Sequence, residues 1–282
     1  MISVCYLVRF RKGKNFTQDI NSLKKFYFSY CLYNAGVMHK LFILIKGPMA
    51  DDSIKIIRKI LPTNVPIIKL ADEGYDLGSF TEFARYRAES YMFILNQHSV
   101  ILCKNWLKIY YTVLTKTKSK IVASTASMSS LANSYYTEIN SLNTFIKYYL
   151  INMLKKIKAK YYFFHFPKYP NPHIRTNALL IKTSLWLNYF KDLHIKSKFQ
   201  CHEIESGKKS FYNYLKKKEI IAIVKRNGQF VTKESDWINF VPFRNKMQRS
   251  NLIISDNQTR FYHKATADKK IHLELETWRK YN

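Results

Sequence analysis

The sequence predicts an α/β fold with a mainly parallel central sheet flanked by helices. Through residues 1–130, short apolar runs alternate with helix-like segments, as they do in repeated strand–helix–strand units. Apolar residues make up 47% of the 282, which is enough to bury a large core. Because the chain shows no internal repeat and no low-complexity linker, we expect a single domain over residues 1–282.

Five strands are expected in the first half of the chain. Each is a short run of apolar residues between turn residues or helix-like segments, which is typical of strands buried on both faces of a parallel sheet. We place them at residues 2–9, 41–45, 65–69, 91–95 and 120–126.

Four helices are expected between these strands, at residues 17–33, 51–61, 79–89 and 106–116. Asn15 or Thr17 can cap the first helix. Asp51 suits the positive end of the dipole of the second helix, and Pro62 ends that helix. Residues 72–79, which precede the third helix, are expected to form a loop.

The second half of the chain is less regular. Its Asn227-Gly228 pair is a strong hairpin signal, and the polar tail from Arg244 onward is expected to wrap the surface. We place an amphipathic helix at residues 141–158, a proline-rich loop at 163–174 and a strand at 175–181. A short helix capped by Thr183 or Ser184 follows, then a helix at 203–217 and a last strand at 220–225.

The formal charge of +28 favours anionic partners or an anionic membrane surface. The alternative is that lysine-rich helices simply keep the protein soluble. No uninterrupted apolar run reaches the roughly 20 residues that span a bilayer, and residues 1–10 lack the features of a signal peptide. We therefore expect a cytoplasmic protein, either soluble or peripheral to a membrane.

Several classes of enzyme lack sequence support. The chain has no Gly-x-x-x-x-Gly-Lys loop, no Gly-x-Gly-x-x-Gly fingerprint, no Gly-x-Ser-x-Gly elbow and no His-Glu-x-x-His helix. Its four cysteines form no Cys-x-x-Cys pair, so a structural zinc site is not expected. Kinase, dehydrogenase, hydrolase and zinc-protease functions are therefore not predicted.

Four polar residues, Asn96, Gln97, His98 and Ser99, directly follow the strand at 91–95. In open α/β sheets, ligands bind outside the carboxyl ends of the strands. We therefore expect these side chains to hydrogen-bond a ligand, with a purely structural strand end as the alternative. Among them His98 is at most one metal ligand, and a site for Mg²⁺ or Mn²⁺ normally needs carboxylates.

Asp76 lies between Gly74 and Gly78, near the start of the third helix. The two glycines let the backbone turn and approach a ligand closely. A carboxylate accepts two hydrogen bonds from a diol, so Asp76 could hold a ribose or sugar hydroxyl. The alternative is a helix cap.

His173, Arg175 and Asn177 follow a loop that prolines stiffen. Because the planar guanidinium matches phosphate oxygens, this segment is a candidate site for an acceptor or a diphosphate. Arg244, in the tail, could neutralise a leaving diphosphate. The alternative for the segment 165–177 is a proline-rich connector with polar surface residues. Also in the tail, Asp256-Asn-Gln258 is a candidate turn.

Glu203 and Glu205 stand at the start of the helix expected at 203–217, where the dipole would keep a carboxylate ionised. A carboxylate held in that form is suited to act as a general base. We prefer Glu205 because Ser206 and Gly207 follow it directly. The alternative is that both residues only cap the helix.

Together these segments resemble a bacterial GT-A-type glycosyltransferase-like family associated with polysaccharide and lipopolysaccharide biosynthesis, including O-antigen and capsule. The resemblance rests on six segments in order: GYDLGS at 74–79, LNQHS at 95–99 with NWL at 105–107, PNPHIRTNA at 170–178, ESG at 205–207, RNG at 226–228 and DNQT at 256–259.

The resemblance implies a Rossmann-like half over about residues 1–130 that binds a nucleotide-sugar, and an acceptor-binding half over about residues 131–282. It implies a donor site that includes Asp76, Gly78 and residues 96–99. It also implies a location at the inner face of the inner membrane. Metal-dependent relatives usually carry an Asp-x-Asp motif, which this sequence lacks. Whether the protein uses a metal is therefore left open. The missing motif also leaves open that this chain is a member of the family without catalytic activity.

We expect an inverting glycosyltransferase of hexosyl or related transfer, which moves a sugar from a nucleotide-sugar donor to a glycan or lipid-linked acceptor. Glu205 would be the base, with Glu203 in reserve. A non-catalytic scaffold for polysaccharide assembly is the first alternative. The second is a basic nucleic-acid-binding protein whose aromatic residues stack on bases, although no recognition motif supports it.

Overall fold

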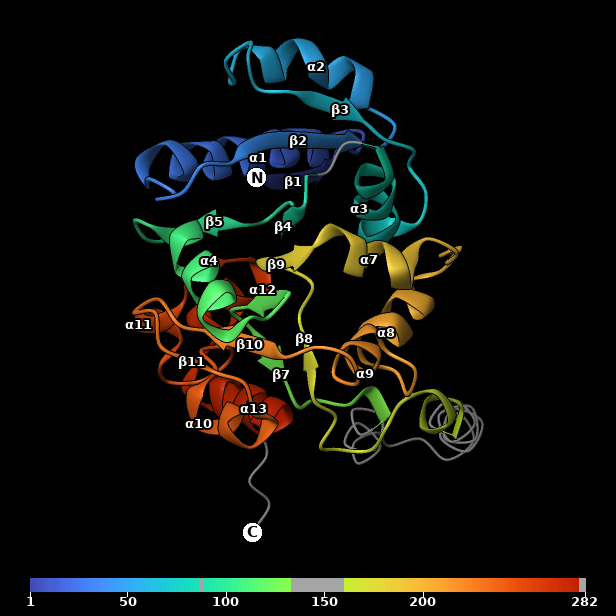
Figure 1. The fold of residues 1–282 in the computed structure, drawn as a ribbon. Coiled ribbons are helices and arrows are strands. Elements are labelled where there is room, and N and C mark those ends of the chain that lie inside the picture. The colour runs from blue at the N-terminus through green and yellow to red at the C-terminus, as the bar shows by residue number, and fades with distance from the viewer. Residues whose placement is uncertain (87–88, 133–159, 279–282) are drawn as a thin grey trace.

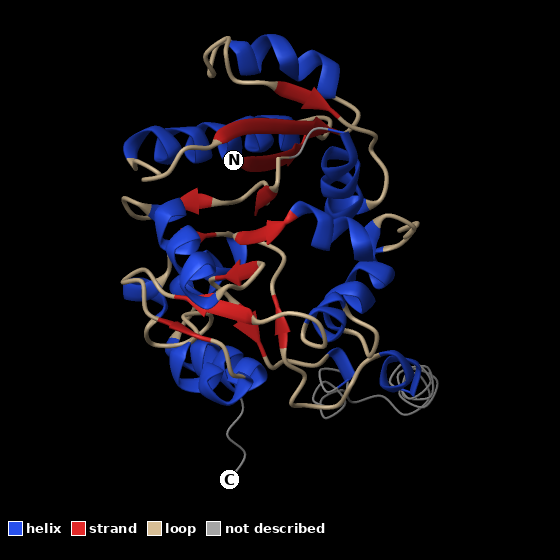
Figure 2. Cartoon of the chain, viewed as in Figure 1, coloured by secondary structure: helices blue, strands red, loops and turns tan. Residues whose placement is uncertain are grey.

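The computed structural model describes residues 1–86, 89–132 and 160–278 (Figure 1). The helix expected at 141–158 lies outside these described residues. The largest sheet in the described part has eight strands in the order β11-β10-β6-β9-β4-β1-β2-β3. Figure 2 shows helices on both sides of this sheet. The predicted α/β fold with a mainly parallel sheet is therefore confirmed.

The strands of the first half lie close to their predicted positions. β1 pairs in parallel with β2 on one side and with β4 on the other, and β2 pairs in parallel with β3. These strands cover Ile2–Arg9 (β1), Lys40–Lys46 (β2), Ile67–Lys69 (β3) and Tyr91–Leu95 (β4). The predicted strand at 120–126 is instead split into β6 (Ile121–Ala123) and β7 (Ala126–Ser127).

The helices of the first half are α1 (Lys14–Leu32), α2 (Ala50–Arg58), α3 (Tyr75–Tyr86) and α4 (Trp106–Thr117). Two starts differ from prediction. Gly13, with φ of 66°, precedes α1, so neither Asn15 nor Thr17 caps it. α3 begins four residues early because Gly74, with φ of 64°, turns the chain and accepts a 2.7 Å hydrogen bond from the Gly78 amide.

One antiparallel strand interrupts the parallel sheet. β9 (Leu179–Lys182) lies between β4 and β6 and runs antiparallel to both. It begins later than the predicted strand at 175–181, because β8 (His173–Ile174) first pairs with β7. The chain then continues into α7 (Thr183–Phe190). The four residues between β8 and β9 therefore belong to neither strand, and their side chains can face the edge of the sheet.

The predicted hairpin at Asn227-Gly228 is confirmed. β10 (Ile221–Val224) runs parallel to β6 and turns back into the antiparallel β11 (Phe230–Val231). Gly228 adopts a φ of 82° in the turn, which an L side chain rarely tolerates.

The helix predicted at 203–217 is wrong at its start. α8 covers Lys198–Ser206, and a separate short helix, α9, covers Phe211–Leu215. The side chain of Ser197 accepts a hydrogen bond from the Gln200 amide and forms a capping box that starts α8 earlier. Glu203 and Glu205 consequently lie in the last turns of α8, where the helix dipole does not favour a carboxylate.

The tail from Arg244 does more than wrap the surface. Leu252, Ile253 and Trp278 in it are buried, so the tail completes the core. Its elements follow η2 (Glu234–Asp236) and α10 (Trp237–Phe240), and they are α11 (Gln248–Asn251), β12 (Ile254–Ser255), α12 (Asn257–Lys264) and α13 (Ala267–Trp278). β12 pairs with β5 (Val100–Ile101), which ties the tail to the loop after β4.

Both faces of the sheet are buried, which explains the continuous apolar runs of its strands. Successive residues of β1 point to opposite faces of the sheet. Tyr6 belongs to a buried cluster with residues of α1, α2 and α4, and Leu7 belongs to one with residues of α3, α7 and α9. Trp106 is fully buried in the first cluster, and its indole nitrogen donates to the Tyr33 carbonyl at 3.2 Å. Within the described part of the chain, no helix is long and apolar enough to cross a membrane.

Replacing Trp106 by alanine should lower the free energy of unfolding by about 3–5 kcal/mol, because a buried aromatic side chain leaves a cavity. Phe28→Ala is the control, since Phe28 on α1 is 71% exposed, and its effect should stay within about 0.5 kcal/mol. Urea unfolding followed by circular dichroism measures both. Equal losses in the two variants would contradict the assignment of the core.

Candidate functional site

The strand order reverses at β1, since β2 lies on one side of it and β4 on the other. Such a switch point opens a crevice at the carboxyl ends of the two strands. A cavity of about 220 Å³ lies there, which we call the switch-point cavity. It is lined by Leu7, Arg9, Asp76, Asn96, Gln97, His98, Arg175, Asp256 and Asn257.

A second cavity, of about 280 Å³, shares Asn96 and Arg175 with the first. We call it the adjoining cavity. Its lining brings together residues of β7, β8, the β8–β9 segment, α8 and the tail, including Ser127, His173, Thr176, Asn177, Glu205, Phe243, Arg244 and Gln258. Six of the predicted site residues therefore line this one space: Asn96, His173, Arg175, Asn177, Glu205 and Arg244.

A buried hydrogen-bond network fixes the wall between the cavities. Asn177 Oδ1 accepts from the Asn96 amide at 2.9 Å and from Ser99 Oγ at 2.8 Å, while Asn177 Nδ2 donates to Asp256 Oδ2 at 3.3 Å. Ser99, Asn177 and Asp256 are all buried. Ser99 and Asn177 thus hold the loop and the tail together, and only Asn177 also lines a cavity.

Arg175 is held in place by an acid and an aromatic ring. Its Nη2 lies 2.7 Å from Asp256 Oδ2, and its guanidinium lies 4.2 Å from the centre of the Phe243 ring. Burial alone would raise the pKa of Asp256, but Arg175 and the hydrogen bonds from Thr259 outweigh burial and lower that pKa. The result is an ionised pair that leaves Arg175 facing both cavities.

Arg244 is a second guanidinium in the adjoining cavity. It lies 3.2 Å from Glu276 and 5.2 Å from the centre of the Phe243 ring, and it donates to Gln258 Oε1 at 2.9 Å. Burial lowers the pKa of Arg244, and repulsion from Arg175 adds to that effect, whereas Glu276 opposes it. Arg175 and Arg244 therefore both lie over the ring of Phe243, at the edge of the adjoining cavity.

Gln97 is anchored at the floor of the switch-point cavity. Its Oε1 accepts from the Arg9 amide at 3.1 Å, and its Nε2 donates to Asp19, which also pairs with Arg11 at 2.6 Å. The Tyr6 hydroxyl donates to the Gln97 carbonyl. Gln97 therefore serves mainly to fix the loop after β4.

Asp76 lies in the first turn of α3, and its side chain is exposed to the cavity. Although the residue as a whole is exposed, the protein atoms around its carboxyl group partly desolvate that group and raise its pKa, and the nearby Lys46 and His98 limit that rise. Lys46 is buried and donates to the Tyr75 carbonyl at 2.7 Å. Gly78 does not reach the cavity: a Cβ on Gly74 would lie only 2.8 Å from the Gly78 Cα, so the glycines allow close packing of the turn.

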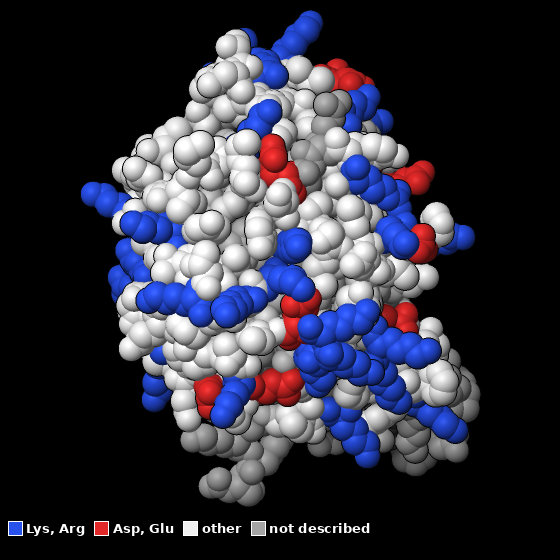
Figure 3. All heavy atoms as spheres, in the orientation of Figure 1, with Lys and Arg blue, Asp and Glu red and all other residues white. Residues whose placement is uncertain are grey.

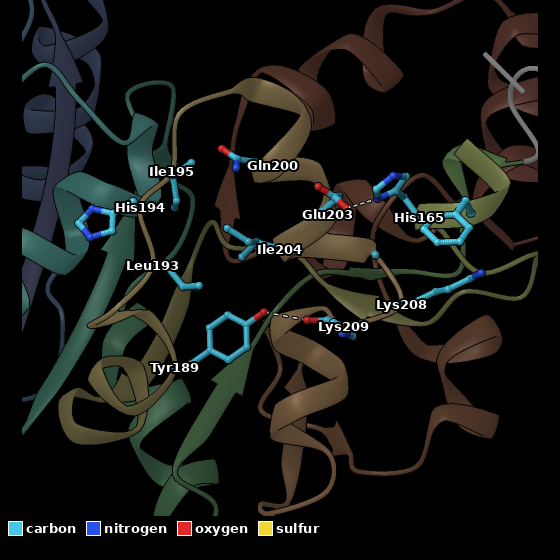
Figure 4. A pocket seen from close by; sticks show the side chains of 12 residues that line it. His165, Tyr189, Leu193, His194, Ile195, Gln200, Glu203, Ile204, Lys208 and Lys209 are labelled. Atoms are coloured by element: carbon cyan, nitrogen blue, oxygen red, sulfur yellow. Dashed lines mark hydrogen bonds and ion pairs between the residues drawn. The ribbon is translucent and has the colours of Figure 1, made fainter. Parts of the chain in front are cut away.

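Glu205 and Glu203 face different cavities. Residues two apart on a helix point about 200° apart, and Glu205 faces the adjoining cavity, where Thr176 Oγ1 donates to it at 2.5 Å. Glu203 lines a separate cavity of about 600 Å³ and pairs with His165, toward which it points in Figure 4. Glu203 is therefore not brought together with the other predicted site residues.

His173 is an uncharged group of the adjoining cavity. Burial lowers its pKa to about 4, and its Nδ1 lies 2.8 Å from the Asn171 carbonyl. That contact places the proton on Nδ1 and leaves Nε2 as a hydrogen-bond acceptor. His173 is thus suited to a hydroxyl group rather than to a diphosphate.

Arg9 was not predicted as a site residue, whereas Thr176 and Asp256 stand in the quoted segments 170–178 and 256–259 without a predicted role of their own. Asp256 N-caps α12 through a capping box with Thr259, so the proposed turn at 256–258 is a helix start. The Asp-x-x-Thr spacing was a visible signal for that cap. Arg9 pairs with Asp72 at 2.7 Å, a contact over 63 residues that no local pattern reveals.

The described residues contain no group of three or more His, Cys, Asp or Glu placed to hold a metal ion. His98, the one candidate ligand, has Arg260 close by. Burial lowers the pKa of His98, and Arg260 and Arg11 lower it further. That positive surrounding suits an anion better than a cation.

No family model and no curated protein matches this sequence. Structures with a similar course of the chain include S. aureus TarS, with 14% identity over 68% of this chain and 30% of that chain and a TM-score of 0.34. The mannosyltransferase Ktr4p from S. cerevisiae, in complex with GDP, has 11% identity over 68% and 61% of the two chains and a TM-score of 0.38.

A third structure is 4-diphosphocytidyl-2C-methyl-D-erythritol synthase from Anaerococcus prevotii, with 12% identity over 85% of this chain and 95% of that chain and a TM-score of 0.39. The chain spans less than two thirds of TarS and of Ktr4p.

Replacing Asp256 by asparagine should lower the free energy of unfolding by roughly 3 kcal/mol, because Arg175 loses its buried partner while the helix cap is kept. Asp72→Asn breaks the more exposed pair with Arg9 and should cost less than about 1 kcal/mol. Chemical denaturation compares the two. Similar small losses would show that the Arg175–Asp256 pair does not organise the site.

The free energy of unfolding should decrease as the pH is lowered from about 6.5 to about 4, because His173 is held neutral in the folded protein. In the unfolded chain His173 takes up its proton at about pH 6.5, whereas in the folded protein it stays neutral down to about pH 4. The unfolded state therefore binds more protons between these values. The loss should reach roughly 2–3 kcal/mol at the acid end. In His173→Gln the decline should be shallower, whereas the exposed His194→Gln control should match the original protein. An unchanged pH profile in His173→Gln would contradict the assignment.

Proposed function

We propose that the protein is a glycosyltransferase that uses a nucleotide-sugar donor. The observation that carries this proposal is the meeting of four separate segments of the sequence resemblance at one edge of the sheet. Asn96 and Ser99, Asn177, and Asp256 are joined by hydrogen bonds, and Glu205 lines the adjoining cavity together with Asn96 and Asn177. Polar segments that are remote in sequence and converge at a switch point are what a ligand site requires.

The donor is proposed to extend from the switch-point cavity into the adjoining cavity, since the two share Asn96 and Arg175 and about 220 Å³ alone is below the roughly 300 Å³ at which pockets for organic ligands begin. Asp76 would accept hydrogen bonds from ribose or sugar hydroxyls, while His98 and the loop after β4 would line its other side. Asn96 Oδ1 is buried without a hydrogen-bond partner among the described residues, and it stands where the two cavities join. A donor hydroxyl would satisfy that oxygen, because buried acceptors are rarely left without a partner.

In the proposed reaction, Glu205 takes the proton from an acceptor hydroxyl as that oxygen attacks the anomeric carbon. The bond between this carbon and the diphosphate breaks, and the leaving oxygen keeps the electron pair. Arg175 and Arg244 would stabilise the negative charge that develops there. A base acting on the face opposite the leaving group inverts the anomeric configuration. The Thr176 hydroxyl would orient Glu205, and the neutral His173 would position the acceptor hydroxyl.

The acceptor is proposed to be a glycan or lipid-linked glycan presented at an anionic membrane surface, with hexosyl or related transfer in cell-surface polysaccharide synthesis. Figure 3 shows Lys and Arg gathered over the region where Figure 1 places α8 and α9. Exposed lysines of this region include Lys208, Lys209, Lys216, Lys217 and Lys218. Such a cluster, of which Lys208 and Lys209 line the cavity that also holds Glu203, would attract lipid phosphates, and the inner face of the inner membrane is the proposed location.

Replacing Glu205 by glutamine should reduce sugar transfer at least about 100-fold, because a general base contributes on that order or more, and should leave donor affinity unchanged. Glu203→Gln is the matched control, since this residue of the same helix faces another cavity. Nucleotide release from UDP-, GDP-, CMP- and dTDP-sugars in the presence of glycan acceptors measures transfer. Normal turnover in Glu205→Gln would remove Glu205 from the mechanism. Donor binding without turnover in the unaltered protein would instead favour a non-catalytic scaffold.

A further inference from the structure

A basic cavity of about 550 Å³ is lined in part by His98, which belongs to the loop that follows β4. It is built from α1, β5, α11, α12 and the β10–β11 turn. The positively charged or titratable side chains that line it are Lys25, His98, Arg226, Arg249, Arg260 and His263. No Asp or Glu stands among the described residues that form its lining. We call it the basic cavity.

The arginines of the basic cavity differ from those of the proposed catalytic site. Arg9, Arg175 and Arg244 each pair with a carboxylate. Within residues 1–86, 89–132 and 160–278, no acidic side chain forms an ion pair with Lys25, Arg226, Arg249 or Arg260. The positive charge of the basic cavity is therefore left uncompensated by its own lining.

Arg260 is the inner cation of this group. Its guanidinium donates to the His98 carbonyl at 2.9 Å and to Ser255 Oγ at 3.2 Å, so its partners are neutral. Burial lowers the pKa of Arg260, while Asp256 and Tyr6 oppose that effect. A half-buried guanidinium beside other cations is costly unless an anion joins it.

The cavity also has an apolar wall. Val100, Leu102 and Leu252 line it between the cations. Its volume falls in the range of pockets for small organic ligands and exceeds what a single phosphate would fill. The fitting ligand therefore combines a multiply charged anionic group with an apolar portion.

We propose that the basic cavity binds the phosphate or diphosphate group of such a ligand. Arg226 and Arg249 at the rim and Arg260 inside would donate to the phosphate oxygens, since the planar guanidinium matches them in pairs. The ligand could be a soluble phosphate ester or the head group of a lipid phosphate, which share this chemistry. His98 lines this cavity and the switch-point cavity alike, so the two occupants would be neighbours.

The test follows the His263 side chain by ¹H–¹³C NMR while inorganic pyrophosphate is added to the protein of residues 1–282. Because His263 lines only the basic cavity among the cavities described above, its shift reports binding there, whatever happens at the proposed donor site. We expect a saturable shift in the unaltered protein. The double variant Arg226→Gln/Arg249→Gln should bind at least about tenfold more weakly, because two charge-assisted contacts are lost.

The matched control is Lys24→Gln/Lys59→Gln, which removes the same charge from exposed residues outside the cavity and should titrate like the unaltered protein. Phosphatidylcholine vesicles with and without phosphatidic acid separate the two sources. Vesicle binding that needs phosphatidic acid and Arg226 and Arg249 identifies a lipid phosphate, whereas a pyrophosphate shift without such binding identifies a soluble ester. If neither probe shifts His263, or if the double variant matches the control, the proposal is overturned.

Discussion

The buried carboxylate of Asp256 ties three distant parts of the chain together. It caps α12, pairs with Arg175 on the segment that enters β9, and accepts from Asn177, which in turn holds the loop after β4. A buried carboxylate is stable only when such partners compensate its lost hydration. The tail, the antiparallel strand and the switch point must therefore assemble together, and the two cavities exist only when they do.

The core explains why so irregular a set of connections holds one geometry. β1, β2 and β4 are buried on both faces, with Tyr6 and Leu7 packing against opposite helical layers. This rigid sheet fixes the carboxyl ends of β1 and β4, and the polar loop after β4 needs only local anchors such as Gln97 and Ser99. Site residues on loops supported by rigid strands are a common way to build a binding site.

The sequence predicted most closely those features that depend on neighbouring residues. The strands Ile2–Arg9 and Tyr91–Leu95 lie where predicted because each consists mainly of apolar residues that are adjacent in the sequence, and residues 96–99 follow at the expected sheet edge. The start of α8 differs from the prediction because the capping box of Ser197 and Gln200 begins the helix earlier in the sequence. Pairs such as Arg175–Asp256, 81 residues apart, arise only from tertiary packing, and no periodicity encodes them.

The most direct test of a donor site between β1 and β4 is a thermal-shift screen of the purified protein with UDP-, GDP-, CMP- and dTDP-sugars, each with and without Mn²⁺. A ligand that binds only the folded state raises the melting temperature by mass action. We expect stabilisation by one nucleotide class, and a smaller stabilisation in an Arg175→Gln variant. An absence of any shift with all four donors would contradict a nucleotide-sugar site at the switch point.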